Sequence, residues 1–256
     1  MDVPVNRLKR ALREGRTQIG LWSSLASYIT VEVLADSGFD WMLLDTEHAP
    51  NELAMLHNQL QAISIGPTSP VVRPAWNDTV VIKRLLDVGA QTLLIPMVQN
   101  AEEAQRAVAA TRYPPGGVRG LGTTTRANHY GRVKDYLYRA HEEICVIVQI
   151  ETQVALDNLE AIAAVDGVDG LFIGPSDLSA DLGYLGRAGE EEFKLKIDTA
   201  IRRICKTGKF AGVLTGVEAD AQRWIDVGAT FTAVGSDVGI LARQSEALAK
   251  RFKAGQ

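Results

Sequence analysis

A helix–glycine–strand unit recurs along the chain, and this repeat constrains the fold more than any other feature of the sequence. In each copy an apolar helix pattern runs through an aspartate to a glycine, and a short apolar stretch follows at once. Gly38, Gly89 and Gly228 occupy the glycine position, and the apolar stretch ends seven residues later in all three copies. Glycine readily takes the left-handed conformation that ends a helix. The equal spacing indicates one structural unit used repeatedly.

Eight apolar stretches of strand length occur along the 256 residues. They lie at residues 18–22, 41–45, 70–73, 92–96, 145–150, 169–174, 209–214 and 230–235. Parallel strands buried on both faces have this continuously apolar character. Helical patterns separate nearly all of the stretches, and alternating strands and helices predict a parallel sheet. Eight units in this length predict an α/β fold with a closed (β/α)8 barrel, a TIM barrel, as one domain over residues 1–256. An open doubly wound sheet is the alternative, but no glycine-rich dinucleotide motif follows the first stretch.

The bulk composition argues against several classes of function. The 27 basic and 31 acidic side chains are interspersed, and the net charge of −4 provides no basic surface for nucleic acid or a membrane. Residues 1–15 lack an apolar core, which argues against a signal peptide, and no apolar run predicts a membrane span. Cys145 and Cys205 lie in unrelated apolar contexts, so we expect reduced thiols and a cytoplasmic protein. The polar, irregular stretch from Pro114 to Gly131 predicts a long loop.

Polar side chains gather at the carboxyl ends of the predicted strands, where (β/α)8 barrels place their chemistry. They include Asp45, Glu47, His48, Arg73, Gln149, Glu151 and Asp177. None of the eight strand ends carries a lysine, and Lys209 begins the seventh strand, at the opposite end. A Schiff-base aldolase requires a lysine among these residues. The pattern therefore favours metal-assisted enolisation over imine chemistry.

Glu151 and Asp177 follow adjacent strands and predict a site for a hard divalent cation. Such ions often bind one or two carboxylates, with water and substrate as the other ligands. Gln149 lies on the same side of its strand as Glu151, because side chains alternate with a period of two. The alternative is that both acids cap the helices that follow, as the sequence Asp177-Leu178-Ser179 allows.

His48, Asp87 and Arg73 are candidates for proton transfer and anion binding. His48 follows Asp45 and Glu47, and acidic neighbours can raise its basicity and orient its ring. Asp87, in the helix after the third strand, is a more distant candidate for orienting His48, or a surface acid at a helix end. Arg73 lies in an otherwise apolar strand and needs an anionic partner. That partner is a carboxylate or enolate of the substrate, or it is the carboxylate of Glu47 or Asp45 in a structural salt bridge.

Several motifs in this order resemble the HpcH/HpaI family of class II pyruvate aldolases. The motifs are Leu44 to Asn51, Val72 to Pro74, Leu86 to Gln91, Thr111 to Pro115 with Arg119-Gly120, Gln149 to Thr152 and Phe172 to Ser179. The resemblance covers essentially the whole chain. It implies a metal-dependent TIM barrel that assembles as a homohexamer, a trimer of dimers, with C-terminal helices exchanged between partners.

Carried over position by position, the resemblance assigns a role to each candidate residue. Glu151 and Asp177 correspond to the ligands of a divalent metal, which is Mg2+, Mn2+ or Co2+. His48 corresponds to the base, Asp87 to the acid that raises its basicity, and Arg73 to the group that stabilises the transition state.

The resemblance also implies the substrates. Gln149, Ser176 and Leu214 correspond to substrate-contacting positions, and the family often has alanine where this chain has Ser176. The implied reaction is reversible aldol cleavage of a 4-hydroxy-2-oxo acid to pyruvate and an aldehyde such as succinic semialdehyde, with hydroxypyruvate as an alternative donor. Other readings are a sugar-acid aldolase, an acyl-CoA lyase, an oxaloacetate decarboxylase, a macrophomate-type condensing enzyme and a non-catalytic binding protein.

Overall fold

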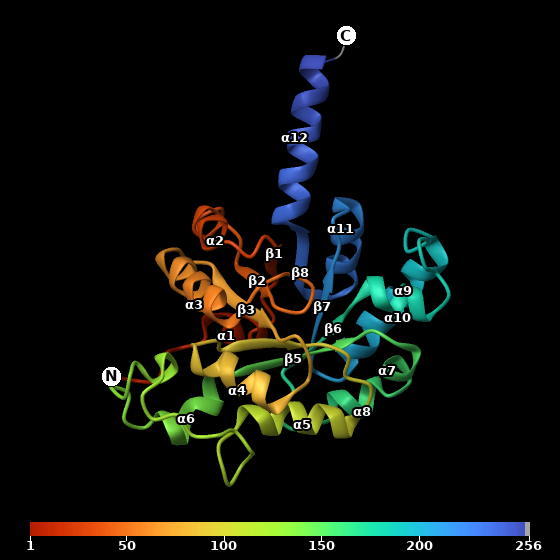
Figure 1. Cartoon of the computed structure of the whole chain (residues 1–256). Helices are drawn as coiled ribbons and strands as arrows, with labels where there is room; N and C mark the ends of the chain where they lie inside the picture. The colour runs from red at the N-terminus through yellow and green to blue at the C-terminus, as the bar shows by residue number, and fades with distance from the viewer. Residues whose placement is uncertain (254–256) are drawn as a thin grey trace.

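A closed barrel of eight parallel strands, with helices around its outside, forms the body of the protein (Figure 1). The computed structural model describes residues 1–253. The strands are β1 (Gln18–Ser23), β2 (Trp41–Asp45), β3 (Ser69–Arg73), β4 (Thr92–Ile95), β5 (Cys145–Ile150), β6 (Gly170–Ile173), β7 (Phe210–Leu214) and β8 (Ala229–Ser236). Each strand pairs with the next, and β8 pairs with β1 to close the ring. The predicted (β/α)8 barrel is confirmed, and each strand end lies within one residue of its predicted position.

Helices connect the strands and surround the barrel. They are α1 (Arg7–Arg13), α2 (Tyr28–Leu34), α3 (Leu53–Ala62), α4 (Thr79–Asp87), α5 (Ala101–Thr111), α6 (Tyr136–Glu143), α7 (Gln153–Asp157), α8 (Leu159–Ala163), α9 (Pro175–Asp181), α10 (Glu191–Lys206), α11 (Glu218–Val227) and α12 (Asp237–Lys253). Two short 3-10 helices, η1 (Ile63–Ile65) and η2 (Arg126–Asn128), supplement them. Within residues 1–253, no helix has the length and apolar character needed to cross a membrane.

The repeated glycines have the backbone conformation that the sequence predicts. Gly89 follows Val88, the C-cap of α4, with φ 102°, and Gly228 caps α11 with φ 128°. Gly38 also has a positive φ of 94°, but α2 already ends at Leu34, so a turn separates the helix from this glycine. The stretch from Pro114 to Gly131 is irregular as predicted, except that it contains η2.

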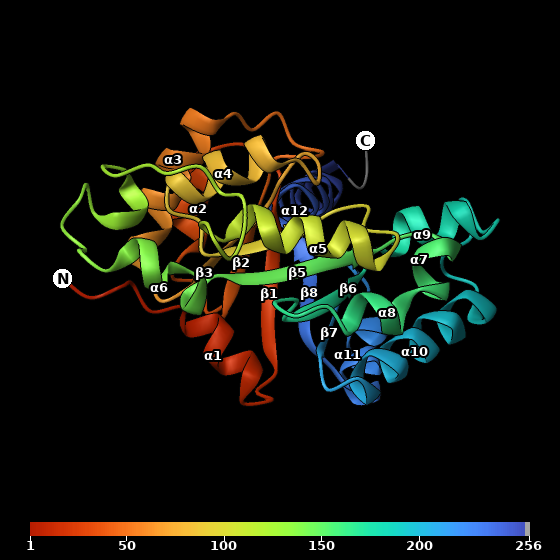
Figure 2. The same cartoon turned by 90° about the horizontal axis from the view of Figure 1, so that it is seen from below.

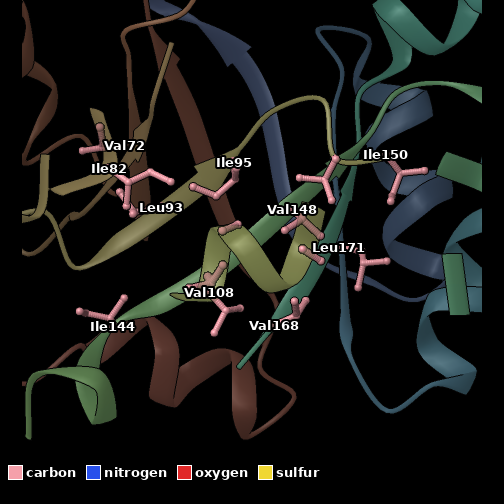
Figure 3. Packing of buried hydrophobic residues seen from close by; sticks show 14 of the residues in the cluster. Val72, Ile82, Leu93, Ile95, Val108, Ile144, Val148, Ile150, Val168 and Leu171 are labelled. Carbon is pink, nitrogen blue, oxygen red and sulfur yellow. The ribbon is translucent and has the colours of Figure 1, made fainter. Parts of the chain in front are cut away.

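Each strand buries both of its faces, which explains the continuously apolar sequence stretches. The inward side chains, such as Leu43, Ile147 and Phe172, fill the barrel interior together with Leu8 and Leu12 of α1. The outward side chains pack against the surrounding helices (Figure 3). Because α1 covers the barrel interior at the end where the strands begin, the interior is accessible from the carboxyl end of the strands.

The last helix leaves the barrel. α12 continues directly from β8 and projects beyond the carboxyl end of the strands in Figure 1, and Figure 2 shows it nearly end-on. Asp237, its first residue, is buried, whereas Leu241, Leu248 and Phe252 are at least half exposed. The exchange of this helix between subunits stays a prediction.

Candidate active site

Arg73 and Asp45 form a buried ion pair at the carboxyl ends of β3 and β2. The two residues are direct neighbours in the strand register, so their side chains leave the sheet side by side. Arg73 donates from Nε to Asp45 Oδ1 at 2.9 Å and from Nη2 to Oδ2 at 2.6 Å. Burial alone would raise the pKa of Asp45, but the bonds and charge of Arg73 outweigh burial and the pKa is lowered. Asp45 is therefore a fixed anion beneath the site.

Trp22, at the end of β1, completes this pair. Its indole Nε1 donates to Asp45 Oδ2 at 3.3 Å, and its ring lies 4.9 Å from the Arg73 guanidinium carbon. The aromatic face stabilises the cation while the indole N–H stabilises the anion. Trp22 is not among the residues predicted from the sequence, where its only signal is an aromatic side chain at the end of a predicted strand.

Glu47 links Arg73 to His48. Arg73 Nη1 lies 2.9 Å from Glu47 Oε2, and His48 Nε2 lies 4.0 Å from Glu47 Oε1. The backbone N–H groups of Glu47 and His48 both donate to Asp45 Oδ1, which fixes the turn after β2. Burial is the main reason that the pKa of Glu47 is raised, and the charge of Asp177 adds to the effect. The His48 side chain is 65% exposed, so its ring is open to substrate.

Glu151 is held in a buried position beside the other acids. Its Oε2 accepts the Met97 backbone N–H at 2.9 Å, and its Oε1 accepts Gln149 Nε2 at 2.6 Å. Burial raises the pKa of Glu151 to about 7; the Met97 N–H opposes the shift, and the negative charges of Glu47 and Asp177 increase it. A buried carboxylate beside two further acids requires a cation or a proton.

Asp177 lies in the first turn of α9, with its side chain exposed and its charge acting on Glu47 and Glu151. Gly174 is the N-cap of α9, and no side chain caps this helix. Thr152 caps α7 after β5. Neither acid is therefore the N-cap residue of the helix that follows it, which leaves both carboxylates available to a ligand.

The geometry around Glu151 fits a hard cation. A Cβ built on Gly174 would lie 2.5 Å from Glu151 Oε1, so the absence of a side chain there makes room for the carboxylate. The Gln149 Oε1 atom is buried and has no hydrogen-bond partner among residues 1–253. Carboxylate and amide oxygens are the ligands that Mg2+ and Mn2+ prefer. The described residues contain no group of three or more His, Cys, Asp or Glu side chains suited to a metal, so water and substrate would complete the coordination.

The other predicted residues lie at different places. Leu214 ends β7 and packs against the apolar interior of the barrel, and Ser176 is exposed in the first turn of α9. Lys209 donates to the Val168 carbonyl just before β7 begins, at the closed end of the barrel as predicted.

Asp87 is not brought to His48 within one chain. It is the last residue of α4, which runs back from the carboxyl end of β3, so Asp87 lies near the start of β4 at the opposite end of the barrel. Its Oδ1 accepts Arg119 Nη2 at 2.8 Å. Arg119 is fully buried with its guanidinium carbon 4.5 Å from the Tyr113 ring centre. In the sequence, Arg119 is recognisable only as part of a motif.

Asp237 is a further acid at the open rim, but its partners are structural. It accepts hydrogen bonds from the Ser23 hydroxyl at 2.9 Å and from the backbone N–H groups of Ser24 and Leu25. These bonds join the start of α12 to the end of β1. Asp237 is therefore occupied in closing the barrel rather than free to bind a ligand.

Known proteins share this fold and sequence. The family model described as HpcH/HpaI aldolase/citrate lyase matches residues 18–243. A 4-hydroxy-2-oxo-heptane-1,7-dioate aldolase from Salmonella dublin is 56% identical over 250 residues, covering 97% of this chain and 95% of the relative. A HpcH/HpaI aldolase/citrate lyase family protein from Burkholderia cenocepacia J2315 is 36% identical with a TM-score of 0.94, covering 97% of this chain and 100% of the other. A HpcH/HpaI aldolase from Desulfitobacterium hafniense DCB-2 is 29% identical with a TM-score of 0.88, covering 96% of each chain.

Proposed function

Because the chain belongs to the HpcH/HpaI aldolase/citrate lyase family, we propose that it is a class II aldolase that cleaves 4-hydroxy-2-oxo-heptane-1,7-dioate to pyruvate and succinic semialdehyde. The main structural support is Glu151, a buried carboxylate with the charge of Asp177 beside it and no cationic side chain bonded to it among residues 1–253. Such an arrangement is unfavourable unless a cation or a proton joins it.

Glu151 and Asp177 are the residues that would hold the divalent cation, Mg2+, Mn2+ or Co2+. When bound, the cation supplies Lewis-acid stabilisation of negative charge on the keto oxygen of the substrate. Gln149 orients Glu151 through its Nε2 donor. Ser176, exposed next to Asp177, and Leu214, beside the barrel interior, are proposed to contact the substrate.

Arg73 is placed to bind the developing enolate. A guanidinium has five N–H donors. Two of them are hydrogen-bonded to Asp45, and Nη1 also forms an ion pair with Glu47. The other donors, on Nη1 and Nη2, can donate to an oxygen that becomes negative as the carbon–carbon bond breaks. Asp45 and Trp22 hold the guanidinium in position, so the structural salt bridge and the catalytic role are compatible.

His48 is proposed to move the proton. In the cleavage direction it removes the proton of the 4-hydroxyl group as the bond between C3 and C4 breaks, which releases the aldehyde. The electron pair passes to the pyruvate enolate, and protonation of C3 then gives the methyl group of pyruvate. The exposed ring of His48, next to Glu47, allows substrate to approach it.

The donor half of this reaction can be tested without knowing the acceptor. The protein is incubated with pyruvate in heavy water, and loss of the methyl signal is followed by NMR with and without a chelator. We expect metal-dependent exchange that is abolished in Glu151→Gln and retained in Glu160→Gln, a surface acid paired with Arg203. Exchange that survives chelation, or trapping of the protein by borohydride, would indicate an imine and refute the metal site.

The acceptor half needs a substrate comparison. We expect a higher kcat/KM with succinic semialdehyde than with tartronate semialdehyde or lactaldehyde, the acceptors of sugar-acid aldolases. The opposite order would assign the enzyme to sugar-acid metabolism, and a preference for acyl-CoA esters would assign it to the lyases.

Asp87 and α12 connect the proposed function to assembly. If Asp87 orients His48, a second copy of the chain must supply it, because the two residues lie at opposite ends of one barrel. We propose that the homohexamer with exchanged α12 helices provides this contact. Mixing inactive His48→Ala with inactive Asp87→Ala protein should then restore activity in the mixed assembly. Inactive mixtures that demonstrably exchange subunits would exclude the shared site.

The cytoplasmic location remains a prediction.

A further inference from the structure

A separate hollow of about 580 Å³ lies at the opposite end of the barrel from Glu151. It is enclosed by residues 4–7, the end of α3 with η1, the start of β3, the turn after α4 and the loop around η2. This volume lies within the range of small-molecule pockets. The hollow can therefore accommodate a small organic compound, independently of the proposed aldolase site.

The formally charged residues that line this hollow are of one sign. They are Arg7 and Arg126, and none of the lining residues is an aspartate or glutamate. The chain as a whole has more acidic than basic residues, 31 against 27, so its overall composition does not explain this. A concave surface with one sign of charge concentrates ions of the opposite sign.

Arg126 is built into the wall rather than free on the surface. Its Nη1 donates to the Val88 carbonyl at 3.0 Å and its Nη2 to the Leu60 carbonyl at 3.1 Å, near the ends of α4 and α3. Gly89 lies directly against the guanidinium, where any side chain would collide with Nη1. Gly89, the glycine between helix and strand in the repeated unit, thus also makes room for Arg126.

Arg126 differs from the other enclosed arginines in lacking an acidic partner. Arg73 contacts two carboxylates and Arg119 contacts one, whereas no carboxylate of residues 1–253 pairs with Arg126. Burial lowers the pKa of Arg126, as expected for a cation that is desolvated without a counter-charge. The helix-end carbonyls carry only partial charge, and three of its five N–H donors remain unused.

We propose that this hollow binds a small organic anion, with its phosphate or carboxylate group at Arg126 and Arg7 and its apolar part against Val5 and Tyr130. Both head groups match the planar donors of a guanidinium. Val5 and Tyr130 line the same hollow with exposed side chains and supply an apolar surface for the rest of the molecule.

Calorimetric titration of the full chain with phenyl phosphate, benzoate and phenol tests this site and separates the two head groups. The titration is repeated with Glu151→Gln protein, which lacks one proposed metal ligand, and binding at the hollow should be unchanged there. We expect saturable binding of at least one of the two anions at millimolar concentration or below, and none of phenol. Arg7→Gln and Arg126→Lys should each weaken it about tenfold or more, because each removes charge-assisted hydrogen bonds. Arg202→Gln, an exposed arginine outside the hollow, is the control and should bind as the unmodified chain does.

Three results would overturn the proposal. One is the absence of saturable binding by either anion. Another is unchanged anion affinity in Arg7→Gln. Because Arg7 is exposed, this substitution should leave the fold intact, so its effect on binding can be measured directly. The third is a change of oligomeric mass in Arg7→Gln, measured by light scattering, without a change in anion binding, which would make the hollow an interface between copies.

Discussion

The Gly174→Ala variant separates the placement of Glu151 from its chemistry. Gly174 has φ −95° and ψ 93°, a conformation open to alanine, so the backbone itself is not strained by the change. The added Cβ would lie 2.5 Å from Glu151 Oε1 and 2.7 Å from its Cγ. Contacts this short cannot persist, so the Glu151 side chain must move.

The cost of that movement follows from the bonds that hold Glu151. Its carboxylate accepts Met97 N–H at 2.9 Å and Gln149 Nε2 at 2.6 Å. Losing one hydrogen bond to a charged group costs about 1.5–3 kcal/mol. If the metal-bound protein loses one such hydrogen bond that the metal-free protein does not need, the affinity for a divalent cation falls by about tenfold to a hundredfold.

Isothermal titration with Mn2+, combined with the pyruvate exchange measurement, tests this prediction. Gly216→Ala is a matched control, because Gly216 lies after β7 at the same end of the barrel and a Cβ there meets nothing within 4 Å. We expect weaker Mn2+ binding and slower exchange in Gly174→Ala alone. Unchanged Mn2+ affinity in a folded Gly174→Ala protein would refute the view that the position of Glu151 controls the metal site.

Three further predictions concern the same rim. Asp45→Asn should lower the free energy of unfolding by about 3–5 kcal/mol, because it breaks the buried pair with Arg73; urea denaturation would show the loss, and the exposed Asp166→Asn should change little. Trp22→Phe should cost about 1 kcal/mol by removing the hydrogen bond to Asp45 while keeping a ring; equal stability would contradict it. Metal-free protein should lose about 3 kcal/mol as pH rises from about 4.5 to about 7, because unfolded glutamate ionises before Glu151, whose pKa is about 7. Added Mg2+ should oppose this loss, and Glu151→Gln should lack it.

The barrel could be predicted because its strands carry their own signal. Burial on both faces favours a nearly continuous run of apolar residues along a parallel strand, so β2 and β5 appear in the sequence with the boundaries that the structure shows. The direction of the chain then places Glu151 and Asp177 at the same end of the barrel, whatever the details of packing. Local sequence and strand polarity were sufficient for these conclusions.

The partners of each side chain depended on tertiary structure. Barrel closure and strand register place Arg73 against Asp45, which settles the salt bridge that the sequence left open. Helix α4 runs antiparallel to the barrel strands and therefore carries Asp87 away from His48, although both residues lie in motifs that resemble the same family. The roles of Gly174 beside Glu151 and of Arg126 beside the helix-end carbonyls also became visible only in the tertiary structure. Their neighbours are distant in sequence, and no local pattern records which distant atoms come within contact distance once the ring closes.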